Sequence, residues 1–228
     1  MTSGVVDNGT LVIDIRGQRI GTEDYTLERR EHGELVLRSQ GKLQFKIAWF
    51  DVKATFEQVI TFTAQRRPMS YQLALDGPMG IGRRRVSASF GATAGIVTDG
   101  ERQSEIALSE EPFLVLGMFS SYAILPLWAT PEAPQKLKVV TLRGDRRDQR
   151  DIWVVLEYVG PVTLYDAQGN SFEAEEYLLK GERLTLKFYL TAKRLLALYN
   201  DTQKNEERFL IYRSDLFPQG FTMPPAHN

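Results

Sequence analysis

Side chains that could perform acid–base or nucleophilic chemistry are scattered through this 228-residue sequence. Glu173 and Glu175, within SFEAEEY, would share one face of a strand with their Cα atoms roughly 7 Å apart, a spacing that suits a general acid and base. Two like charges on an exposed strand face are far more common than such a pair, so we expect no catalytic residue here. Ser120 and Ser121, within GMFSSY, lack the G-x-S-x-G turn of a hydrolase nucleophile and suit close packing of a buried helix.

The sequence has few residues that could support metal or thiol chemistry. The chain has no cysteine, which excludes disulfides, thiolate catalysis and cysteine-ligated metals. Its two histidines are His32, in the predicted turn REHGE, and His227, the penultimate residue. Neither an H-E-x-x-H helix nor an Asp-rich calcium loop occurs. We therefore expect no cofactor and no metal site.

A glycine-rich segment, GPMGIGRRR over residues 77–85, resembles a phosphate-binding loop only superficially. It lacks the Lys-Ser/Thr ending, and the strand-like RVSASF follows where such loops require a helix. The segment therefore predicts a hairpin turn. Arg83 and Arg85 could still bind an anionic headgroup through charge-assisted hydrogen bonds. A second arginine-rich segment, residues 143–151, mixes both charge signs and is typical of a solvated hairpin tip.

Composition is that of an ordinary globular protein, with 43 % hydrophobic and 25 % charged residues and a formal net charge of −1. No whole-chain field attracts nucleic acid, so we expect no nucleic-acid partner. The sequence starts without the basic and apolar regions of a signal peptide. Cytoplasmic residence is the default expectation, and a bacterial envelope location is the alternative if a leader has been removed.

Alternation of apolar and polar residues is the dominant pattern. KLQFKIAWF and ERLTLKFYLT both have an apolar residue at every second position, so that these residues share one face of a strand. This pattern predicts half-buried strands of an antiparallel sheet. Glycine and Asp-Gly turns separate roughly a dozen such runs. Their length favours a curved sheet over a compact sandwich. We predict an all-β fold, a mainly antiparallel meander curled into an open or partly closed barrel.

The most apolar stretch, FLVLGMFSSYAILPLW over residues 113–128, breaks this alternation. About 13 apolar residues precede Pro126, fewer than the roughly 20 that a membrane-spanning helix needs, so we expect no transmembrane segment. Ser109 could cap a helix, and two glutamates and Pro112 suit its first turn. We predict one short buried helix over residues 113–125 that plugs the curved sheet.

The chain is expected to form a single β-rich domain over residues 1–228. Two β-rich halves, residues 9–108 and 136–213, are joined by the apolar helix and the Pro-rich link TPEAPQK, residues 130–136. Each half alone would leave a sheet face bare, which favours one domain over two. The final segment, FPQGFTMPPAHN over residues 217–228, is expected to be a loose tail.

Large apolar residues on the concave face of such a sheet form either an ordinary core or the wall of a ligand chamber. We expect non-catalytic binding of an apolar or amphipathic, lipid-like small molecule, with Arg83 or Arg85 at the mouth. One alternative is an interaction or scaffold protein with a filled core, and a weaker one is a hydrolase or lyase that uses cavity carboxylates. The expected lining residues are Phe45, Trp49, Phe56, Phe62, Phe119, Tyr122 and Trp128.

The opening segment, GTLVIDIRGQRIGTEDYTLERREHGELVLRSQGKL, resembles the first hairpins of DUF3108-like proteins, an uncharacterised bacterial β-rich family. Gly17, Gly21, Tyr25 and the apolar segment at 113–127 carry this resemblance. Such proteins are distantly similar to the LolA/LolB-like lipoprotein-carrier half-barrel. The resemblance implies a curved antiparallel sheet whose helical lid holds acyl chains.

Overall fold

The computed structural model describes residues 3–47, 50–78, 83–108, 113–142, 152–182, 185–200 and 208–222. Strands dominate these residues, and one short 3-10 helix accompanies them. The first eight strands are β1 (Gly4–Ile15), β2 (Gln18–Arg29), β3 (Leu35–Ile47), β4 (Phe50–Phe62), β5 (Pro68–Asp76), β6 (Arg83–Phe90), β7 (Ala94–Asp99) and β8 (Arg102–Ala107).

The remaining elements begin with the apolar stretch and continue to the C-terminal side of the chain. They are β9 (Phe113–Leu116), the helix η1 (Phe119–Leu127), β10 (Gln135–Thr141), β11 (Ile152–Asp166), β12 (Ser171–Gly181), β13 (Thr185–Leu190), β14 (Leu195–Asn200), β15 (Phe209–Arg213) and β16 (Phe221–Thr222).

All of the described strands belong to one sheet in the order β8-β7-β6-β5-β4-β3-β2-β1-β15-β14-β13-β12-β11-β10-β9, and β16 pairs with β11 outside this path. Two meanders therefore meet at the β1–β15 ladder, where Leu11 lies opposite Arg213. Every pairing is antiparallel except that of β9 with β10. Hydrogen bonds do not close the sheet between the described strands β8 and β9, although Lys138 Nζ on β10 donates to the Ala107 carbonyl at 2.7 Å. The predicted open, curled, mainly antiparallel fold is confirmed.

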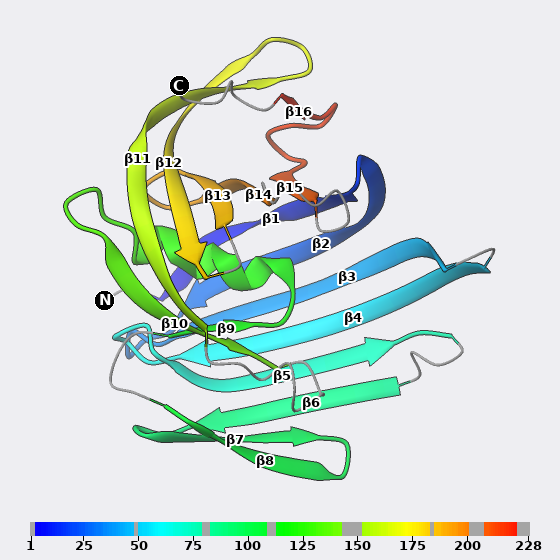
Figure 1. The fold of residues 1–228 in the computed structure, drawn as a ribbon, viewed down its shortest axis with the longest axis vertical. Coiled ribbons are helices and arrows are strands. Elements are labelled where there is room, and N and C mark those ends of the chain that lie inside the picture. The colour runs from blue at the N-terminus through cyan, green and yellow to red at the C-terminus, as the bar shows by residue number, and fades with distance from the viewer. Residues whose placement is uncertain are drawn as a thin grey trace.

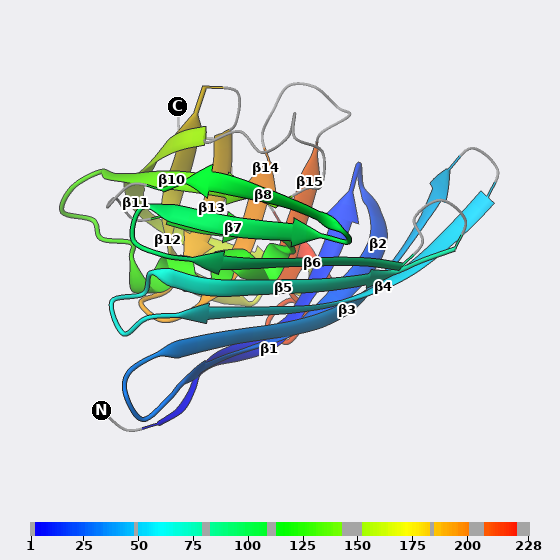
Figure 2. The same ribbon diagram turned by 90° about the horizontal axis from the view of Figure 1, so that it is seen from below.

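The sheet curls so that its two meanders face one another across η1 (Figure 1). Seen from below, β3–β8 form a curved layer, and β12–β15 run behind it at a steep angle (Figure 2). We call the face that lines the main core the inner face and the opposite face the outer face. The main core includes residues of both meanders and of η1, such as Leu37, Ile60, Ile124 and Leu198.

Period-two burial explains why these segments form strands. Along β4, Val52, Ala54, Phe56 and Gln58 are buried, whereas the intervening residues 51, 53, 55 and 57 are exposed. Burying one face while the other meets water is the pattern of a half-buried antiparallel strand. The alternation predicted for KLQFKIAWF is confirmed at residues 42–46 and continues over 51–58, and these residues belong to the hairpin of β3 and β4.

The apolar segment over residues 113–128 differs from the predicted helix at its start, where residues 113–116 form a strand. Phe113, Leu114 and Val115 are about 1 % exposed and form β9, which pairs with β10. A short, fully apolar run fits a strand covered on both faces as well as a buried helix, so periodicity does not separate the two. The helix begins only at Phe119, and seven of its residues are buried: Ser120, Ser121, Tyr122, Ala123, Ile124, Leu125 and Pro126. The predicted Ser109 cap lies outside the described residues.

The C-terminal segment is ordered further than the expected loose tail. Phe217 is fully buried on the outer face of the second meander, in a smaller core with Val12, Leu164 and Tyr189. Phe221 begins β16 and packs edge-on against the Phe217 ring at 5.0 Å. The tail prediction is therefore wrong up to Thr222, because two aromatic residues in the segment cover an apolar outer face.

A buried polar cluster ties β1, β2 and β15 together at the junction of the two meanders. The Arg213 side chain is 1 % exposed; its Nη1 donates to Asp7 Oδ1 at 2.8 Å and to the Tyr25 hydroxyl at 3.1 Å. Asp215 accepts Nε and Nη2 at 3.0 and 2.7 Å, and Tyr25 donates to Asp7 Oδ2 at 2.6 Å. Burial and the Asp7 charge raise the pKa of Tyr25, which keeps its hydroxyl proton available to donate. A Cβ on Gly9 would overlap the Arg213 guanidinium.

Candidate ligand-binding cleft

The sheet forks between β2 and β3. Pairing of these strands ends at Gly21 opposite Leu43. The β1–β2 hairpin continues to Ile15 opposite Gln18, and the β3–β4 hairpin continues to Ile47 opposite Phe50. Beyond the apex the two hairpins diverge as separate arms: β1 and β2 curl away while β3 and β4 extend outward (Figure 1).

Glycine and a bulge set the position of this fork. A Cβ on Gly21 would overlap the Lys42 carbonyl oxygen and crowd the Leu43 side chain, so the last β2–β3 pair requires glycine. The β1–β2 register shifts between Ile13 and Asp14, which leaves Ile20 as an extra residue on β2. Such a bulge bends and twists its strand. The two features together turn the β1–β2 arm away from β3.

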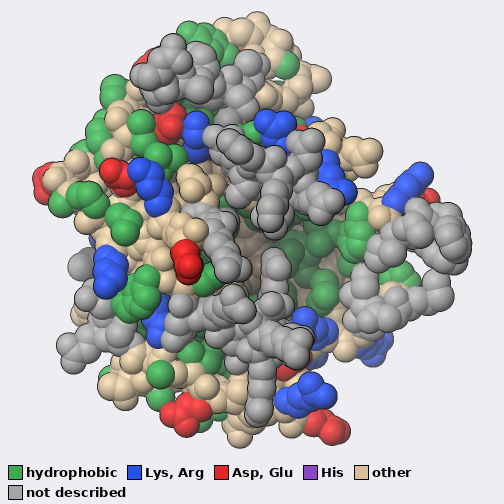
Figure 3. Space-filling view, in the orientation of Figure 1, with side chains coloured by type: hydrophobic (Ala, Val, Ile, Leu, Met, Phe, Trp, Pro, Cys, Tyr) green, Lys and Arg blue, Asp and Glu red, His purple; other side chains and the backbone are tan. Residues whose placement is uncertain are grey.

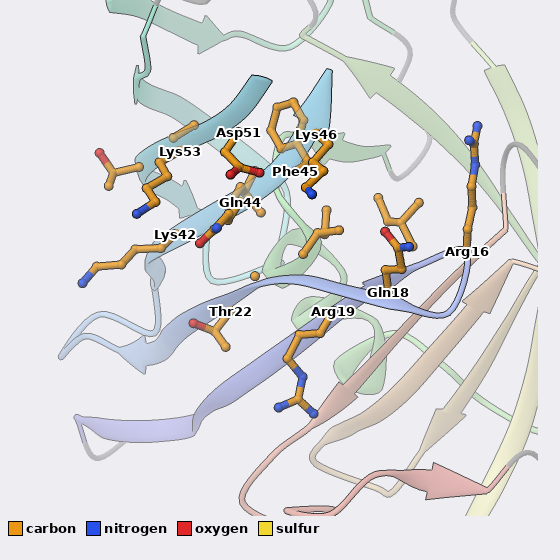
Figure 4. Close-up of a pocket in the computed structure, with 16 residues that line it drawn as sticks. Arg16, Gln18, Arg19, Thr22, Lys42, Gln44, Phe45, Lys46, Asp51 and Lys53 are labelled. Atoms are coloured by element: carbon orange, nitrogen blue, oxygen red, sulfur yellow. The ribbon is translucent and has the colours of Figure 1, made fainter. Parts of the chain in front are cut away.

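A cleft of about 1250 Å³ occupies the fork. The close-up in Figure 4 shows Lys42, Gln44 and Lys53 together on the β3–β4 arm, whereas Arg16 and Arg19 leave the β1–β2 arm in opposite directions. The space-filling view is hollowed where the arms part, and hydrophobic side chains are visible in the hollow (Figure 3). The lining residues are Ile15, Arg16, Gln18, Arg19, Ile20, Gly21, Thr22, Lys42, Leu43, Gln44, Phe45, Lys46, Asp51, Lys53, Ala54 and Thr55.

The two sides of the cleft differ in chemistry because it passes around the unpaired edge of β3. Ile15, Ile20 and Leu43 are half-buried and pack against the main core on the inner side. On the outer side lie the exposed side chains of Lys42, Lys46 and other polar residues. Five cationic residues but only one carboxylate, that of Asp51, line the cleft. The cleft is therefore amphipathic, with an apolar inner side and a cationic outer side.

Arg19, one of the cations of this cleft, contacts two residues of its own protein. Its Nη2 donates to the Tyr212 hydroxyl at 2.7 Å, and its Nε lies 3.9 Å from Asp14 Oδ1. Partial burial raises the pKa of Asp14, an effect that Arg19 partly offsets. Arg19 thus holds the base of the β1–β2 arm against β15.

Behind the cleft, polar side chains on the inner face fix η1. Glu23 is the next inner-face residue of β2 after Gly21, and its Oε2 accepts the Ser120 N–H at 3.1 Å. Gln58 on β4 accepts the Met118 N–H at 2.8 Å and donates to Ser120 Oγ at 3.2 Å. These contacts satisfy backbone donors at the start of the helix that have no partner within it. Ser120 and Ser121, examined above as nucleophiles, therefore act in packing and capping contacts.

Glu23 is fully buried, and no cationic side chain among the described residues pairs with it. Burial raises the pKa of the Glu23 carboxyl, and the hydrogen bond from the Ser120 N–H opposes the rise. Ser39 lies close enough to influence this pKa, although neither its hydroxyl nor Glu23 Oε1 completes a hydrogen bond within the described part of the chain. Burial likewise raises the pKa of Tyr71, whose hydroxyl also lacks such a bond. These inner-face polar residues connect the sheet to η1 and are buried from solvent: Glu23, Ser39, Gln58 and Tyr71.

The residues expected to line one chamber lie in different parts of the structure. Phe45 lines the cleft, whereas Phe56 and Phe62 are about 2 % and 1 % exposed within the sheet core, and Trp49 lies outside the described residues. Phe119 and Tyr122 on η1 contact Phe209 and Phe188, with ring centroids 5.5 and 5.2 Å apart.

Trp128 and the expected mouth arginines lie elsewhere. Trp128 caps the end of η1, and its carbonyl accepts Gln135 Nε2 at 2.6 Å. Arg83 and Arg85 lie exposed on the outer face, at 3.5 and 3.2 Å from the Asp76 carboxylate. They are absent from the cleft lining.

The two carboxylates considered as an acid–base pair lie away from this cleft. Glu173 accepts the Thr163 hydroxyl at 3.2 Å and Glu175 accepts the Tyr177 hydroxyl at 3.1 Å, both on the β11–β12 hairpin. No group of three or more His, Cys, Asp or Glu side chains suited to a metal occurs in the described ranges. Of the helices described, none has the length and apolar character to cross a bilayer.

Sequence reasoning missed the lysines of the cleft. The alternation of KLQFKIAWF indicates only that Lys42 and Lys46 lie on the polar face of a strand. Gly21, one of the residues that carry the family resemblance, is the fork apex, but a glycine alone does not show where two hairpins separate.

Comparison with known proteins identifies a fold and no family. No family model matches the chain, and no curated protein matches it. A beta-barrel-like protein of domain of unknown function DUF1849 from Brucella abortus matches with a TM-score of 0.59 and 8 % identity, over 90 % of this chain and 93 % of the other. A DUF1089 family protein from Pseudomonas aeruginosa matches with a TM-score of 0.51 and 9 % identity, over 78 % and 88 %.

The chain is therefore similar in fold to β-barrel-like proteins of uncharacterised families. Identities of 8 and 9 % support the shared architecture and carry no information about ligands. The predicted resemblance to an uncharacterised β-rich family is confirmed at this level.

Proposed function

We propose that this protein binds an amphipathic, lipid-like small molecule without catalysis, and that the fork cleft is the binding site. The observation that carries the proposal is the change in chemistry across the cleft, from half-buried Ile15, Ile20 and Leu43 to exposed lysines. A volume of about 1250 Å³ exceeds the roughly 300–1,000 Å³ typical of small-molecule sites, so an extended chain has room.

This site differs from the chamber expected beneath the helix. Around η1 the inner face is filled, because Ile124, Leu125 and Phe188 are fully buried against it. The proposal therefore places the ligand at the open end of the curled sheet, where Phe45 lies, instead of under η1. The resemblance of the sequence to DUF3108-like proteins and to lipoprotein-carrier half-barrels is part of this proposal, and it agrees with acyl-chain binding.

A scaffold role is the second candidate, favoured by a separate observation. Trp153, Val155 and Val159 on β11 are each about 40 % exposed, an apolar stripe distant in sequence from the cleft. Exposed apolar patches of this kind often contact other proteins. Under this alternative the fork would be incidental to function.

Native mass spectrometry of the purified protein, followed by organic extraction, tests the first proposal. We expect a small-molecule adduct that is lost on denaturation and contains an alkyl chain. The variant Leu43→Asp should lose the adduct because it places a carboxylate on the apolar side of the cleft, whereas Leu73→Asp, at another half-buried inner-face position, provides the matched control. Absence of any adduct, together with failure to bind added fatty acids, would reject the proposal.

A further inference from the structure

We infer that the ligand carries an anionic headgroup, which Lys42, Lys46 and Lys53 bind on the outer side of the fork while its chain passes to the inner side. This inference rests on the proposed function and specifies the class of amphiphile: a single-chain carboxylate or phosphate-type anion.

The register of the β3–β4 arm brings the three lysines together. Lys53 lies directly opposite Gln44, so Lys42 and Lys46, two residues to either side of Gln44, are its diagonal neighbours on the same face. Diagonal neighbours in a sheet lie roughly 7–8 Å apart at their Cα atoms, within reach of long side chains. The three ammonium groups can therefore converge on one anion near Gln44, whose amide is a further hydrogen-bond donor.

No ion pair or hydrogen bond of the Lys42, Lys46 and Lys53 side chains is present among the described residues. Their charges are therefore not neutralised by a carboxylate contact, as the charge of Arg85 is by Asp76 at 3.2 Å. Like charges on neighbouring strands repel one another, so this cluster carries an energetic cost that a bound anion would offset.

The lining of the cleft is net positive, with five cationic residues and one carboxylate. Asp51, opposite Lys46 on the same face, is the single acidic residue of the cleft lining. Asp24 and Glu57 line an adjoining depression of about 410 Å³ that shares Thr22, Lys42 and Thr55 with the cleft. Neither lies within 4 Å of a lysine nitrogen of the cluster in the described part of the chain.

The edge of β3 connects the headgroup site to the apolar side. Beyond Leu43 this edge has no β2 partner, so a ligand can pass around it without displacing a strand. Leu43 and Phe45 alternate with Lys42, Gln44 and Lys46 along the edge. A headgroup at Gln44 would thus lie one strand thickness from an apolar surface that also includes Ile15 and Ile20.

Isothermal titration with chain-matched ligands below their micellar concentrations tests the inference. The probes are dodecanoate, dodecyl phosphate, neutral dodecyl maltoside, cationic dodecyltrimethylammonium and inorganic phosphate. We expect the two anionic amphiphiles to bind at least tenfold more tightly than the neutral one, with an affinity that falls as salt is raised. The double variant Lys42→Gln/Lys53→Gln should abolish this preference, so that the anionic amphiphiles bind no more tightly than the neutral one.

The control Arg38→Gln/Lys193→Gln removes two exposed charges outside the cleft and should keep the preference. Equal affinity for anionic and neutral amphiphiles would overturn the headgroup inference and leave the proposed function standing. Tighter binding of the cationic amphiphile would overturn it as well. Inorganic phosphate binding as tightly as dodecyl phosphate would show a free-anion site and refute the role of the chain. No binding of any amphiphile would reject the proposed function itself.

Discussion

Replacing Arg213 by Met should destabilise the whole protein, because the guanidinium is the central group of the buried cluster that joins the two meanders. The substitution leaves the Asp7 side chain, which is 0 % exposed, without its closest cation at 2.8 Å. Removing one partner of a buried ion pair typically costs about 3–5 kcal/mol. Tyr25 still donates to Asp7 and Arg194 Nε lies 3.8 Å away, so we expect the lower value, about 3 kcal/mol.

Urea denaturation and thermal melting measure this effect. A loss of about 3 kcal/mol corresponds to a fall in Tm of about 6–12 °C for a chain of this size. The double variant Asp7→Asn/Arg213→Met should lose less than the sum of the single variants, because it leaves no unpaired buried charge. Arg38→Met removes an exposed arginine of the same charge and should change stability by less than about 0.5 kcal/mol.

The same experiment tests our proposal that the two β-rich halves form one domain. Fluorescence of the tryptophans and far-UV circular dichroism should report one coincident transition in the wild-type protein. An Arg213→Met protein as stable as the wild type, or additive effects in the double variant, would refute the account of the cluster. Two separate transitions in the wild type would refute the single domain.

Three further predictions concern Gly21 at the fork apex, the buried carboxyl of Glu23 and Phe217 in the C-terminal segment. Gly21→Ala should lower the affinity for dodecanoate in titration calorimetry, because its Cβ would displace the Lys42 carbonyl and shift the arms. Because burial raises the pKa of Glu23, the contribution of this carboxyl to stability is present below its ordinary pKa of 4.5 and is lost as pH rises through the folded-state pKa. The stability of Glu23→Gln relative to wild type should therefore increase with pH, by about 1.4 kcal/mol for each unit of the pKa shift. Urea titrations across pH measure this difference. Phe217→Ala should cost about 3–5 kcal/mol in the same denaturation assay, since the ring is fully buried.

Each of these predictions has a result that would contradict it. Unchanged dodecanoate affinity in Gly21→Ala would show that the apex does not control the cleft. A constant difference between Glu23→Gln and wild type across pH would mean that the carboxyl titrates normally. A loss of less than about 1 kcal/mol in Phe217→Ala would place the C-terminal segment outside the folded core.

Much of the fold could be predicted from sequence because period-two alternation reports burial directly. In KLQFKIAWF and the following run, the inner and outer faces follow the alternating pattern wherever the structure describes them. The start of η1 and the strand at Phe113 could not be predicted, since an apolar run buried on all sides has no periodicity to distinguish them. The aromatic pair Phe217 and Phe221 was likewise hidden within a Pro- and Gly-rich segment.

The candidate site was only partly predictable. Phe45 was identified from its place on an apolar strand face, but the same criterion selected Phe56 and Phe62, which lie deep in the core. Arg83 and Arg85 were chosen because arginines cluster in sequence, whereas Lys42 and Lys53 come together only through the β3–β4 register. A fork depends on where pairing between two hairpins stops, and local residue patterns do not encode that point.

Photo-crosslinking is the most direct test that an amphiphile occupies the fork. A dodecanoate carrying a terminal diazirine would be irradiated with the protein and the modified peptides identified by mass spectrometry. The account predicts labelling of cleft-lining residues within 15–22, 42–46 and 51–55, competition by unlabelled dodecanoate, and weaker labelling at the same dodecanoate concentration in Lys42→Gln/Lys53→Gln. Saturable labelling confined to other segments, such as the exposed stripe around Trp153, would contradict it.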